Sequence, residues 1–422
     1  MIRFCNGRQL RFGGGLRLTE EELWVDGGKI AYIGPAPETL PTFERVIDLG
    51  GDVVIPGFKN AHTHTAMTFL RSYADDMPLS EWLTQQVFPN EAKLTPEMLY
   101  VFTKIGILEY LSSGITASFD MYFHNDAYVQ ANLDTGFRTV ICAALNNFDR
   151  DVENIEREYL KFNAMDERVS YRFGIHAEYT TCMERMEYLV GLAHKYKQPC
   201  FTHLCETKAE VEGCVERYGM TPPQLLDSIG FFDYGGGGFH CNWMSDEDVA
   251  LFAEKKLWAV TNPCSNLKLA SGICPVDRLL DAGVPMAIGT DGAASNNALD
   301  FFRELYLASV LQKVASYDAA AGGAERVLEM ACVGGARVMG LDDCDDLAPG
   351  KRADLAVIDL QRPNMQPVHN IVKNLVYAGS KENVRLTMVN GKVLYERGEF
   401  FIGEDPAQLY RTANEMIKDL YT

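Results

Sequence analysis

Five of the eight histidines in this 422-residue chain stand at the end of an apolar, strand-length run or just beyond one. They are His62, His64, His176, His203 and His240, and Asp291 follows another such run. A lone histidine in an apolar run is more often a hydrogen-bonded core residue than a metal ligand. Chance scattering rarely puts five at equivalent places, so the sequence predicts that these side chains share one site.

The first pair, His62 and His64, is separated by a single residue. Alternation along a strand points both side chains to one face, where two imidazoles form a natural chelate. Adding His203 and Asp291 from other strand ends gives three neutral nitrogen ligands and one carboxylate, with room for a water if the coordination expands. The set predicts one divalent metal. Zinc suits this mixture, and ferrous iron or manganese would also accept it.

A metal in such a site lowers the pKa of its bound water from about 15.7 toward about 7, which supplies hydroxide for hydrolysis. The reaction then needs proton carriers. Glu206, three residues after His203, could protonate a ring nitrogen during the attack. Asp291 can take the proton from the water, and His240 can orient the hydroxide or stabilise developing charge. The less favoured alternatives are a solvated loop carboxylate for Glu206 and a packed core residue for His240.

The elements that must position these residues lie in the middle of the chain, where apolar strand-length runs alternate with amphipathic helical segments. This alternation predicts repeated β-α units and a parallel sheet. Strands are expected at 53–58, 115–122, 138–145, 171–177, 199–204, 238–243, 257–262 and 285–289, and helices at 96–112, 183–196, 246–255 and 299–313. Eight units fit a closed α/β barrel of the TIM type, (β/α)₈, in which chemistry lies at the carboxyl ends of the strands. An open doubly wound sheet is the alternative.

Both ends of the chain have a different residue pattern from the middle. Short alternating runs broken by glycine fill the first 55 residues or so, and they return at 354–359 and 384–393, where Asn390-Gly391 favours a hairpin. The two ends are predicted to pair into one small β-sandwich, followed by a helix over 406–420. The expected division is 1–56 with 346–422 for the composite sandwich, and 57–345 for the barrel.

Composition narrows the class of partner. The net charge of −19 argues against a nucleic-acid surface, which needs lysine and arginine to replace phosphate counterions. No apolar stretch approaches the 18 residues of a membrane span, and the first thirty residues lack the pattern of a signal peptide, so a cytoplasmic location is expected. Eleven irregularly spaced cysteines indicate reduced thiols. A small-molecule substrate is the predicted partner, and the sequence leaves open whether the chain forms a homo-oligomer.

The segment from Pro56 to His64, PGFKNAHTH, resembles the first-strand signature of the amidohydrolase superfamily. The resemblance implies a (β/α)₈ barrel flanked by a β-sandwich from both chain ends. Further segments narrow it: 70–83, DMYFH at 120–124, NPCSNLKLASG at 262–272 and GTDGAASNN at 289–297. Together they resemble the 5-methylthioadenosine/S-adenosylhomocysteine deaminases and the related triazine chlorohydrolases. The implied reaction is hydrolytic release of ammonia from the 6-amino group of an adenine nucleoside.

The resemblance also implies roles for individual residues. The metal ligands and the proton-handling pair are those already argued from chemistry. In addition, Glu91 falls where relatives grip the ribose hydroxyls, His176 where a second polar group contacts the nucleoside, and Ser295 where relatives place a purine contact.

One departure from the family pattern bears on the substrate. Deaminases that accept homocysteine adducts are expected to hold the substrate carboxylate with an arginine near the end of the third strand, because a guanidinium binds a carboxylate in a bidentate way. The stretch 141–147 contains none; Arg138 stands at the start of that strand and Arg150 well beyond it. Whether either reaches a carboxylate is not readable from the sequence. The pattern favours 5′-methylthioadenosine or adenosine over S-adenosylhomocysteine.

Two alternatives remain at this stage. The first is an aminohydrolase or chlorohydrolase of the same fold that acts on guanine, an oxidised purine, a pterin or an s-triazine; Glu206 favours deamination but does not choose the ring. The second is a metal-free barrel that serves only in binding or assembly. The complete ligand set argues against it, and metal analysis of the purified protein separates the two.

Overall fold

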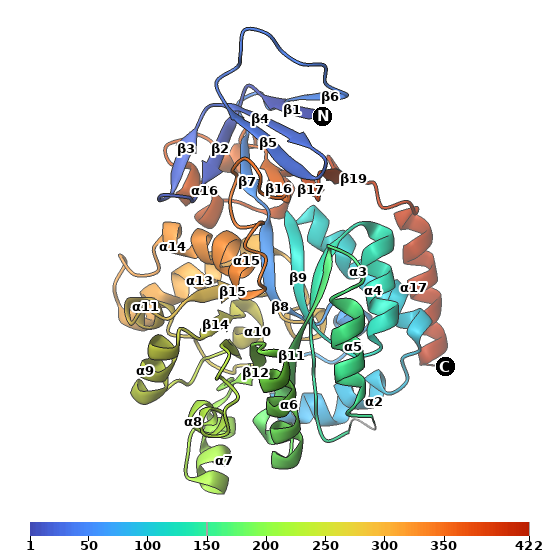
Figure 1. Ribbon diagram of the computed structural model, residues 1–422, viewed down its shortest axis with the longest axis vertical. Helices are drawn as coiled ribbons and strands as arrows, with labels where there is room; N and C mark the ends of the chain where they lie inside the picture. Colours follow the sequence, from blue (N-terminus) through green and yellow to red (C-terminus); the bar gives the residue numbers. More distant parts are fainter. Residues whose placement is uncertain (149–150, 422) are drawn as a thin grey trace.

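The computed structural model describes residues 1–148 and 151–421. Eight parallel strands form a barrel in chain order, and a β-sandwich lies at one end of it (Figure 1). The barrel strands are β8 (Phe58–Thr63), β9 (Ile115–Met121), β10 (Arg138–Cys142), β11 (Val169–Ala177), β12 (Cys200–Leu204), β13 (Gly236–His240), β14 (Trp258–Thr261) and β15 (Met286–Ile288). The predicted α/β barrel is confirmed.

The last strand meets the first through contacts beside the candidate metal ligands. The main-chain N–H of Asp291 donates to the carbonyl oxygen of His62 at 3.0 Å. The side chain of Asn60 donates to the Thr290 hydroxyl at 2.7 Å and accepts from the Thr290 N–H at 2.8 Å. These bonds fix the end of β15 against β8, so that His62 and Asp291 become neighbours although they are far apart in the sequence.

The helices that surround the barrel begin where the sequence offers caps. Predicted helices at 96–112, 183–196 and 246–255 coincide with α3 (Pro96–Ser112), α6 (Met183–Tyr196) and α9 (Asp246–Lys255). The Thr95 hydroxyl accepts from the N–H of Met98 at the start of α3, and Ser245 with Asp248 forms a capping box at the start of α9. Helix α13 (Phe301–Ser316) begins two residues later than predicted because Asp300 caps it.

The remaining helices complete the outer layer and the connections. They are α4 (Asn125–Thr135), α5 (Asn154–Phe162), α7 (Lys208–Tyr218), α8 (Pro222–Ser228), α10 (Pro263–Lys268), α11 (Val276–Asp281), α12 (Ala293–Asn296), α14 (Ala324–Glu329), η4 (Met330–Gly334), α15 (Gly335–Val338) and α16 (Ile371–Tyr377). The predicted terminal helix is present as α17 (Pro406–Leu420), which packs against α3 (Figure 1).

The prediction was wrong for the first barrel strand. The run 53–58 is mostly β7 (Val53–Pro56), a strand of the sandwich, and the barrel strand begins only at Phe58. The chain changes sheets at Gly57, whose N–H donates to the carbonyl of Asp354, and a Cβ there would lie 2.2 Å from Thr116. Because both strands are buried along their whole length, hydrophobicity alone did not mark the boundary.

The sandwich is built from both ends of the chain, as predicted. One sheet has the order β5-β4-β1-β6 and the other β19-β18-β17-β16-β7-β2-β3. Their strands are β1 (Ile2–Cys5), β2 (Arg8–Arg11), β3 (Arg17–Thr19), β4 (Glu22–Asp26), β5 (Lys29–Gly34), β6 (Arg45–Asp48), β16 (Leu355–Ile358), β17 (Val384–Val389), β18 (Lys392–Glu396) and β19 (Glu399–Phe400). The predicted Asn390-Gly391 hairpin joins β17 to β18, with positive φ at both residues. The division of the chain at residues 56 and 345 stays a prediction.

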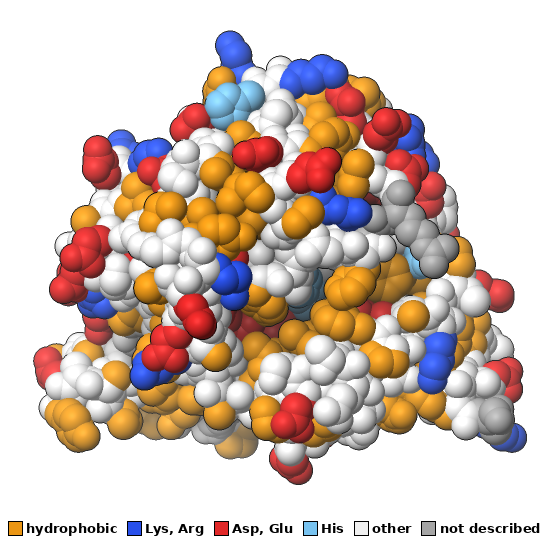
Figure 2. All heavy atoms as spheres, turned by 90° about the horizontal axis from the view of Figure 1, so that it is seen from below, with side chains coloured by type: hydrophobic (Ala, Val, Ile, Leu, Met, Phe, Trp, Pro, Cys, Tyr) orange, Lys and Arg blue, Asp and Glu red, His pale blue; other side chains and the backbone are white. Residues whose placement is uncertain are grey.

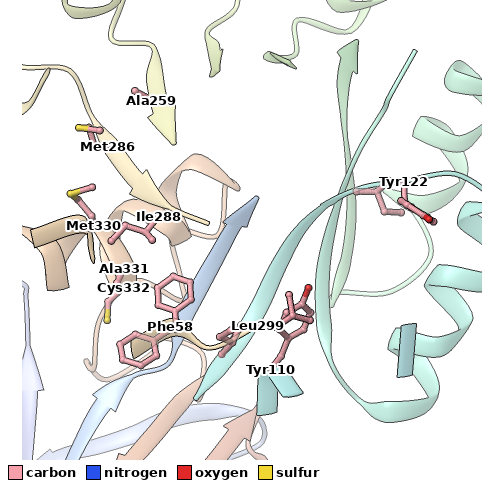
Figure 3. Close-up of a cluster of buried hydrophobic side chains, with 14 of the residues drawn as sticks. Phe58, Tyr110, Tyr122, Ala259, Met286, Ile288, Leu299, Met330, Ala331 and Cys332 are labelled. Atoms are coloured by element: carbon pink, nitrogen blue, oxygen red, sulfur yellow. The ribbon is translucent and has the colours of Figure 1, made fainter. Parts of the chain in front are cut away.

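The largest hydrophobic cluster lies between the barrel and its outer helices. Phe58 of β8 stacks on Phe301 with ring centroids 5.2 Å apart. Ile288 of β15 and the segment Met330–Cys332 belong to the same cluster (Figure 3). Each fully buried side chain of this kind contributes about 1.5–3 kcal/mol. The packing holds β8 and β15 side by side and thereby supports the strand ends that carry the polar residues.

A segment of short helices follows β8 at the carboxyl end of the barrel. It contains η1 (Thr65–Leu70), α1 (Leu79–Glu81), η2 (Trp82–Val87) and α2 (Phe88–Glu91), and η2 is a π-helix. Tyr421, which follows α17, stacks on Tyr73 of this segment, with ring centroids 4.6 Å apart. Across the part of the chain that the structure describes, no helix has the length and apolar character needed to span a membrane.

Arg138 joins the barrel to the sandwich and is 2% exposed. Its guanidinium donates to both carboxylate oxygens of Asp354, at 2.6 Å and 3.2 Å, and to the carbonyl of Glu167 at 2.9 Å. A buried pair of this kind is costly to break, because the remaining partner is left as an uncompensated charge.

We expect Arg138→Met to lower the free energy of unfolding by about 3–5 kcal/mol, as measured by urea denaturation. Arg362→Met serves as the matched control, because Arg362 pairs with Asp359 at the surface, where such pairs contribute about 0–1 kcal/mol. Equal destabilisation by the two changes would contradict the role assigned to Arg138.

Candidate active site

A cavity of about 950 Å³ lies at the carboxyl ends of the barrel strands. Seen from the end opposite the sandwich, the molecule is hollowed near its centre, and histidine is visible inside the hollow (Figure 2). The lining includes predicted site residues, namely His64, His176, His203, Glu206, His240 and Asp291. His62 lies beneath them and is fully buried. The structure therefore brings together all five histidines that the sequence placed in one site.

Three imidazoles and one carboxylate converge on a common point. Oδ1 of Asp291 lies 3.2 Å from Nε2 of His64 and 3.6 Å from Nε2 of His62. Nε2 of His203 lies 3.4 Å from Nε2 of His64. Ligands bound at 2.0–2.1 Å in a tetrahedron are separated by roughly 3.3–3.4 Å, so these distances suit a metal of zinc's size.

The protonation states of these three histidines and Asp291 also favour a bound cation. Neither ring nitrogen of the buried His62 has a hydrogen-bond partner among the described residues. Burial lowers the pKa of His62 to about 3, which keeps this imidazole neutral. Burial also lowers the pKa of His64, but the adjacent Asp291 carboxylate outweighs it and raises that pKa to about 9. Without a metal, a proton on His64 balances the negative charge of Asp291. A bound divalent cation would take over that role.

Contacts behind the candidate ligands orient them. Nδ1 of His64 lies 2.5 Å from the carbonyl oxygen of Met121, and Nδ1 of His203 lies 2.6 Å from that of His176. Each carbonyl accepts a hydrogen bond, so Nδ1 carries the proton and Nε2 presents its lone pair to the centre. The geometry and the donor set thus fit a divalent metal.

Glu206 and His240 face one another beside these ligands. Oε2 of Glu206 lies 3.9 Å from Nε2 of His240. The Ser271 hydroxyl donates to Oε1 of Glu206 at 3.0 Å, and Nδ1 of His240 lies 2.7 Å from the amide oxygen of Asn266. Burial raises the pKa of Glu206, which favours its protonated form. A carboxyl group that holds a proton within the cavity is suited to act as a general acid.

Comparison with known proteins agrees with this geometry. The sequence model described as Amidohydrolase family matches residues 53–394, which is most of the chain. The chain belongs to the amidohydrolase family. It is 40% identical over 385 residues to a 5-methylthioadenosine/S-adenosylhomocysteine deaminase of Moorella thermoacetica, with 89% of this chain and 90% of that protein covered.

Two solved structures resemble this amidohydrolase over nearly its whole length. An adenosine deaminase from Xanthomonas campestris with bound zinc superposes with a TM-score of 0.94 at 32% identity, covering 100% of this chain and 98% of that one. An atrazine chlorohydrolase from Arthrobacter aurescens complexed with zinc gives a TM-score of 0.91 at 23% identity, covering 99% and 100%. The second likeness concerns the fold alone.

Two of the three predicted substrate contacts of this amidohydrolase, Glu91 and His176, line the cavity. Glu91 ends α2, and burial raises its pKa to about 7 despite the neighbouring Tyr122 hydroxyl. His176 lies near the end of β11, with Nδ1 2.9 Å from the Thr180 hydroxyl. Burial lowers the pKa of His176 to about 4, so its imidazole is neutral. Both side chains are placed to meet a ligand held over the metal ligands.

Ser295 is the third predicted substrate contact, and its contact with the purine stays a prediction. It is 2% exposed and is not among the residues that line the cavity. Its hydroxyl donates to Oδ2 of Asp291 at 2.8 Å, and the Ser265 hydroxyl donates to the same oxygen at 2.6 Å. Ser295 is the third residue of the short helix α12. Its side chain is directed toward Asp291 rather than toward the cavity. Its position supports orientation of the carboxylate, so that Oδ1 faces the imidazoles.

For this reason Ser295→Ala is expected to lower kcat by about 10-fold to 100-fold, the usual cost of losing a partner of a metal ligand, with little change in KM. Steady-state kinetics with 5′-methylthioadenosine would measure both constants. A contact to the purine predicts the opposite pattern, a raised KM with kcat nearly intact.

Several residues that support the site received no role from the sequence. Ser265, Asn266 and Ser271 lie in the segment 262–272, which was noted only for its resemblance to the family. Glu210, on α7, accepts the main-chain N–H groups of Cys205 and Glu206 at 2.7 Å and 2.8 Å and so fixes the turn after β12. The spacing of four residues between Glu206 and Glu210, around the helix cap Thr207, was the available signal.

Neither of the two arginines considered as partners for a substrate carboxylate is among the described residues that line the cavity. Arg138 binds Asp354 at the opposite end of β10, next to the sandwich, and is not among the cavity residues. Arg150 lies outside the described residues. Among the described residues that line the cavity there is no lysine and no arginine.

Proposed function

We propose that this amidohydrolase hydrolyses the 6-amino group of an adenine nucleoside, and that it prefers 5′-methylthioadenosine or adenosine to S-adenosylhomocysteine. One observation carries the proposal: a complete set of metal ligands shares a cavity with a protonatable carboxyl group, Glu206. The likeness to proteins named 5-methylthioadenosine/S-adenosylhomocysteine deaminase and adenosine deaminase supports the choice of ring.

His62, His64, His203 and Asp291 would hold one divalent metal, with zinc favoured by the donor set and by the zinc in the Xanthomonas relative. When bound, the metal activates a water for attack on the ring carbon. All three imidazoles are buried, and Asp291 would provide the one anionic ligand.

The chain's own residues would move the protons. Asp291 takes one proton from the attacking water on a carboxylate oxygen. Glu206 donates a proton to the adjacent ring nitrogen from Oε2, because Oε1 is held by the Ser271 hydroxyl. The amino group then leaves as ammonia with a proton returned through these carboxyl groups. His240 lies within reach of Glu206 and would stabilise charge that develops at the attacking oxygen.

Glu91 and His176 would position the nucleoside. An ionised Glu91 can accept hydrogen bonds from both ribose hydroxyls, and the neutral His176 can accept or donate one bond to the substrate. The lack of lysine and arginine among the described lining residues disfavours a substrate with a free carboxylate.

An ammonia-release screen of the metal-loaded protein tests the proposal. The substrates are 5′-methylthioadenosine, adenosine, S-adenosylhomocysteine, guanine, a pterin and an s-triazine. The expected result is the highest kcat/KM for an uncharged adenine nucleoside. Turnover of guanine, the pterin or the triazine with no release of ammonia from the adenosines would overturn it.

A further inference from the structure

One wall of the cavity, formed by the start of α4 and by α5, carries a cluster of hydrogen-bond acceptors. Glu158 of α5 lines the cavity together with Asn125 and Asn154. The side-chain amide of Asn125 donates to Oε2 of Glu158 at 2.8 Å, and that of Asn154 donates to Oε1 at 2.9 Å. The Tyr171 hydroxyl donates to Oε2 at 3.2 Å. We call Asn125, Asn154 and Glu158 the acceptor pocket.

The acceptor pocket has acceptor capacity that the described residues do not use. Asn125 is 6% exposed, and its Oδ1 has no hydrogen-bond partner among the described residues. Its orientation is fixed, because a flipped amide would place oxygen against the Glu158 carboxylate. A carboxylate accepts roughly four hydrogen bonds, and Glu158 receives three from the side chains above. A buried acceptor without a donor costs free energy unless a ligand provides the donor.

Glu158 has no cationic partner among the described residues, while the Arg157 guanidinium donates to Oδ1 of Asn154 at 3.3 Å. The three donors to Glu158 are amides and a phenol, and no lysine or arginine of the described residues forms an ion pair with it. The cavity lining also contains the carboxylates of Glu91, Asp151, Glu206 and Asp291. Burial raises the pKa of Glu158, so an ammonium group beside it would favour the ionised carboxylate and supply donors to the acceptors around it.

The placement of the ring carbon and the ribose determines which part of a nucleoside would reach the acceptor pocket. The reacting ring carbon must lie over His203 and Asp291, and Glu91 is proposed to hold the ribose hydroxyls. The 5′ carbon is then the part of the nucleoside free to extend to another wall. The cavity lining also includes Phe123, Leu145 and Ile155, which suit an apolar linker.

We propose that the acceptor pocket selects adenine nucleosides whose 5′-substituent is an apolar chain ending in a primary ammonium group. This inference rests on the proposed deaminase function and names the substrate class of the same site. Asn125 Oδ1 and the free lone pair of Glu158 accept the N–H groups of the ammonium, and the carboxylate balances its charge. A 5′-substituent that ends in a carboxylate would be repelled by the Glu158 carboxylate.

Three probes of matched length test the proposal: adenosines that carry 5′-propylthio, 5′-(3-aminopropylthio) and 5′-(2-carboxyethylthio) groups. Since a charge-assisted hydrogen bond in a partly buried site is worth about tenfold or more in affinity, kcat/KM for the amine should exceed that for the propyl compound by about tenfold. The carboxylate should be the poorest of the three. Equal values for amine and propyl, or a preference for the carboxylate, would overturn the proposal without the use of any variant.

Variants then locate the effect. Glu158→Gln keeps the shape but removes the charge, and it should reduce the ratio of the amine to the propyl compound to about one. Glu156→Gln on the same helix is the matched control, since Glu156 binds Lys195 and Tyr196 at the surface, and it should keep the wild-type ratio. Retention of the ratio in Glu158→Gln refutes the assignment. Failure of the enzyme to deaminate any of the three nucleosides instead refutes the proposed function.

Discussion

Replacement of Glu206 by glutamine is expected to lower kcat by about 10²-fold to 10⁴-fold, the usual contribution of a positioned general acid. Glutamine has the same shape and can still accept from the Ser271 hydroxyl, but it has no proton to give to the ring. Since Glu206 is not one of the four converging ligands, the variant should bind as much metal as the wild type. The measurement is kcat for 5′-methylthioadenosine together with the metal content of the same sample.

A matched control is available on the helix that follows Glu206. Glu212 of α7 is exposed and pairs with Lys208, so Glu212→Gln should retain wild-type kcat. If Glu206→Gln were as active as Glu212→Gln, Glu206 would not be the proton donor. If it lost its metal, Glu206 would belong to the ligand set.

Asp291→Asn should have a still larger effect. A proton acceptor alone contributes about 10²-fold to 10⁴-fold, and this change also removes the only carboxylate among the four converging ligands. Asparagine can neither take the proton nor offset the charge of a divalent cation. Both the activity and the metal content should therefore fall, whereas Glu206→Gln lowers the activity alone.

Metal analysis by atomic spectroscopy and ammonia release, performed on one preparation, separates these two patterns. Asp281→Asn provides the control, since Asp281 pairs with Arg326 at the surface. Asp291→Asn with full metal content and more than a tenth of the wild-type activity is the outcome that the proposed roles forbid.

The sequence predicted the parts of this protein that depend on local signals. Residues at the carboxyl ends of parallel strands meet at one end of a barrel, so His62, His203 and Asp291 could be placed together before their distances were known. Helices with a capping residue and a first-turn proline, such as α3, were predicted to the residue. The division between β7 and β8 was missed because it depends on Gly57 fitting against Thr116, a contact between residues far apart in the sequence.

Side-chain partners were harder to predict than strand ends. The hydrogen bond from the Ser295 hydroxyl to Asp291 was not predicted, because the direction of a side chain on a four-residue helix depends on tertiary packing. The bond between Arg138 and Asp354 joins two segments that no local pattern connects. The acceptor pocket likewise arises only when α4, α5 and β11 pack together.

Titration of the metal-free protein with zinc, while ammonia release from 5′-methylthioadenosine is followed, tests the central claim most directly. The four converging ligands predict no activity without metal, a linear rise with added zinc, and saturation at one equivalent per chain. Deamination by the metal-free protein, or a zinc-loaded protein that releases no ammonia from any adenine nucleoside, would contradict the account.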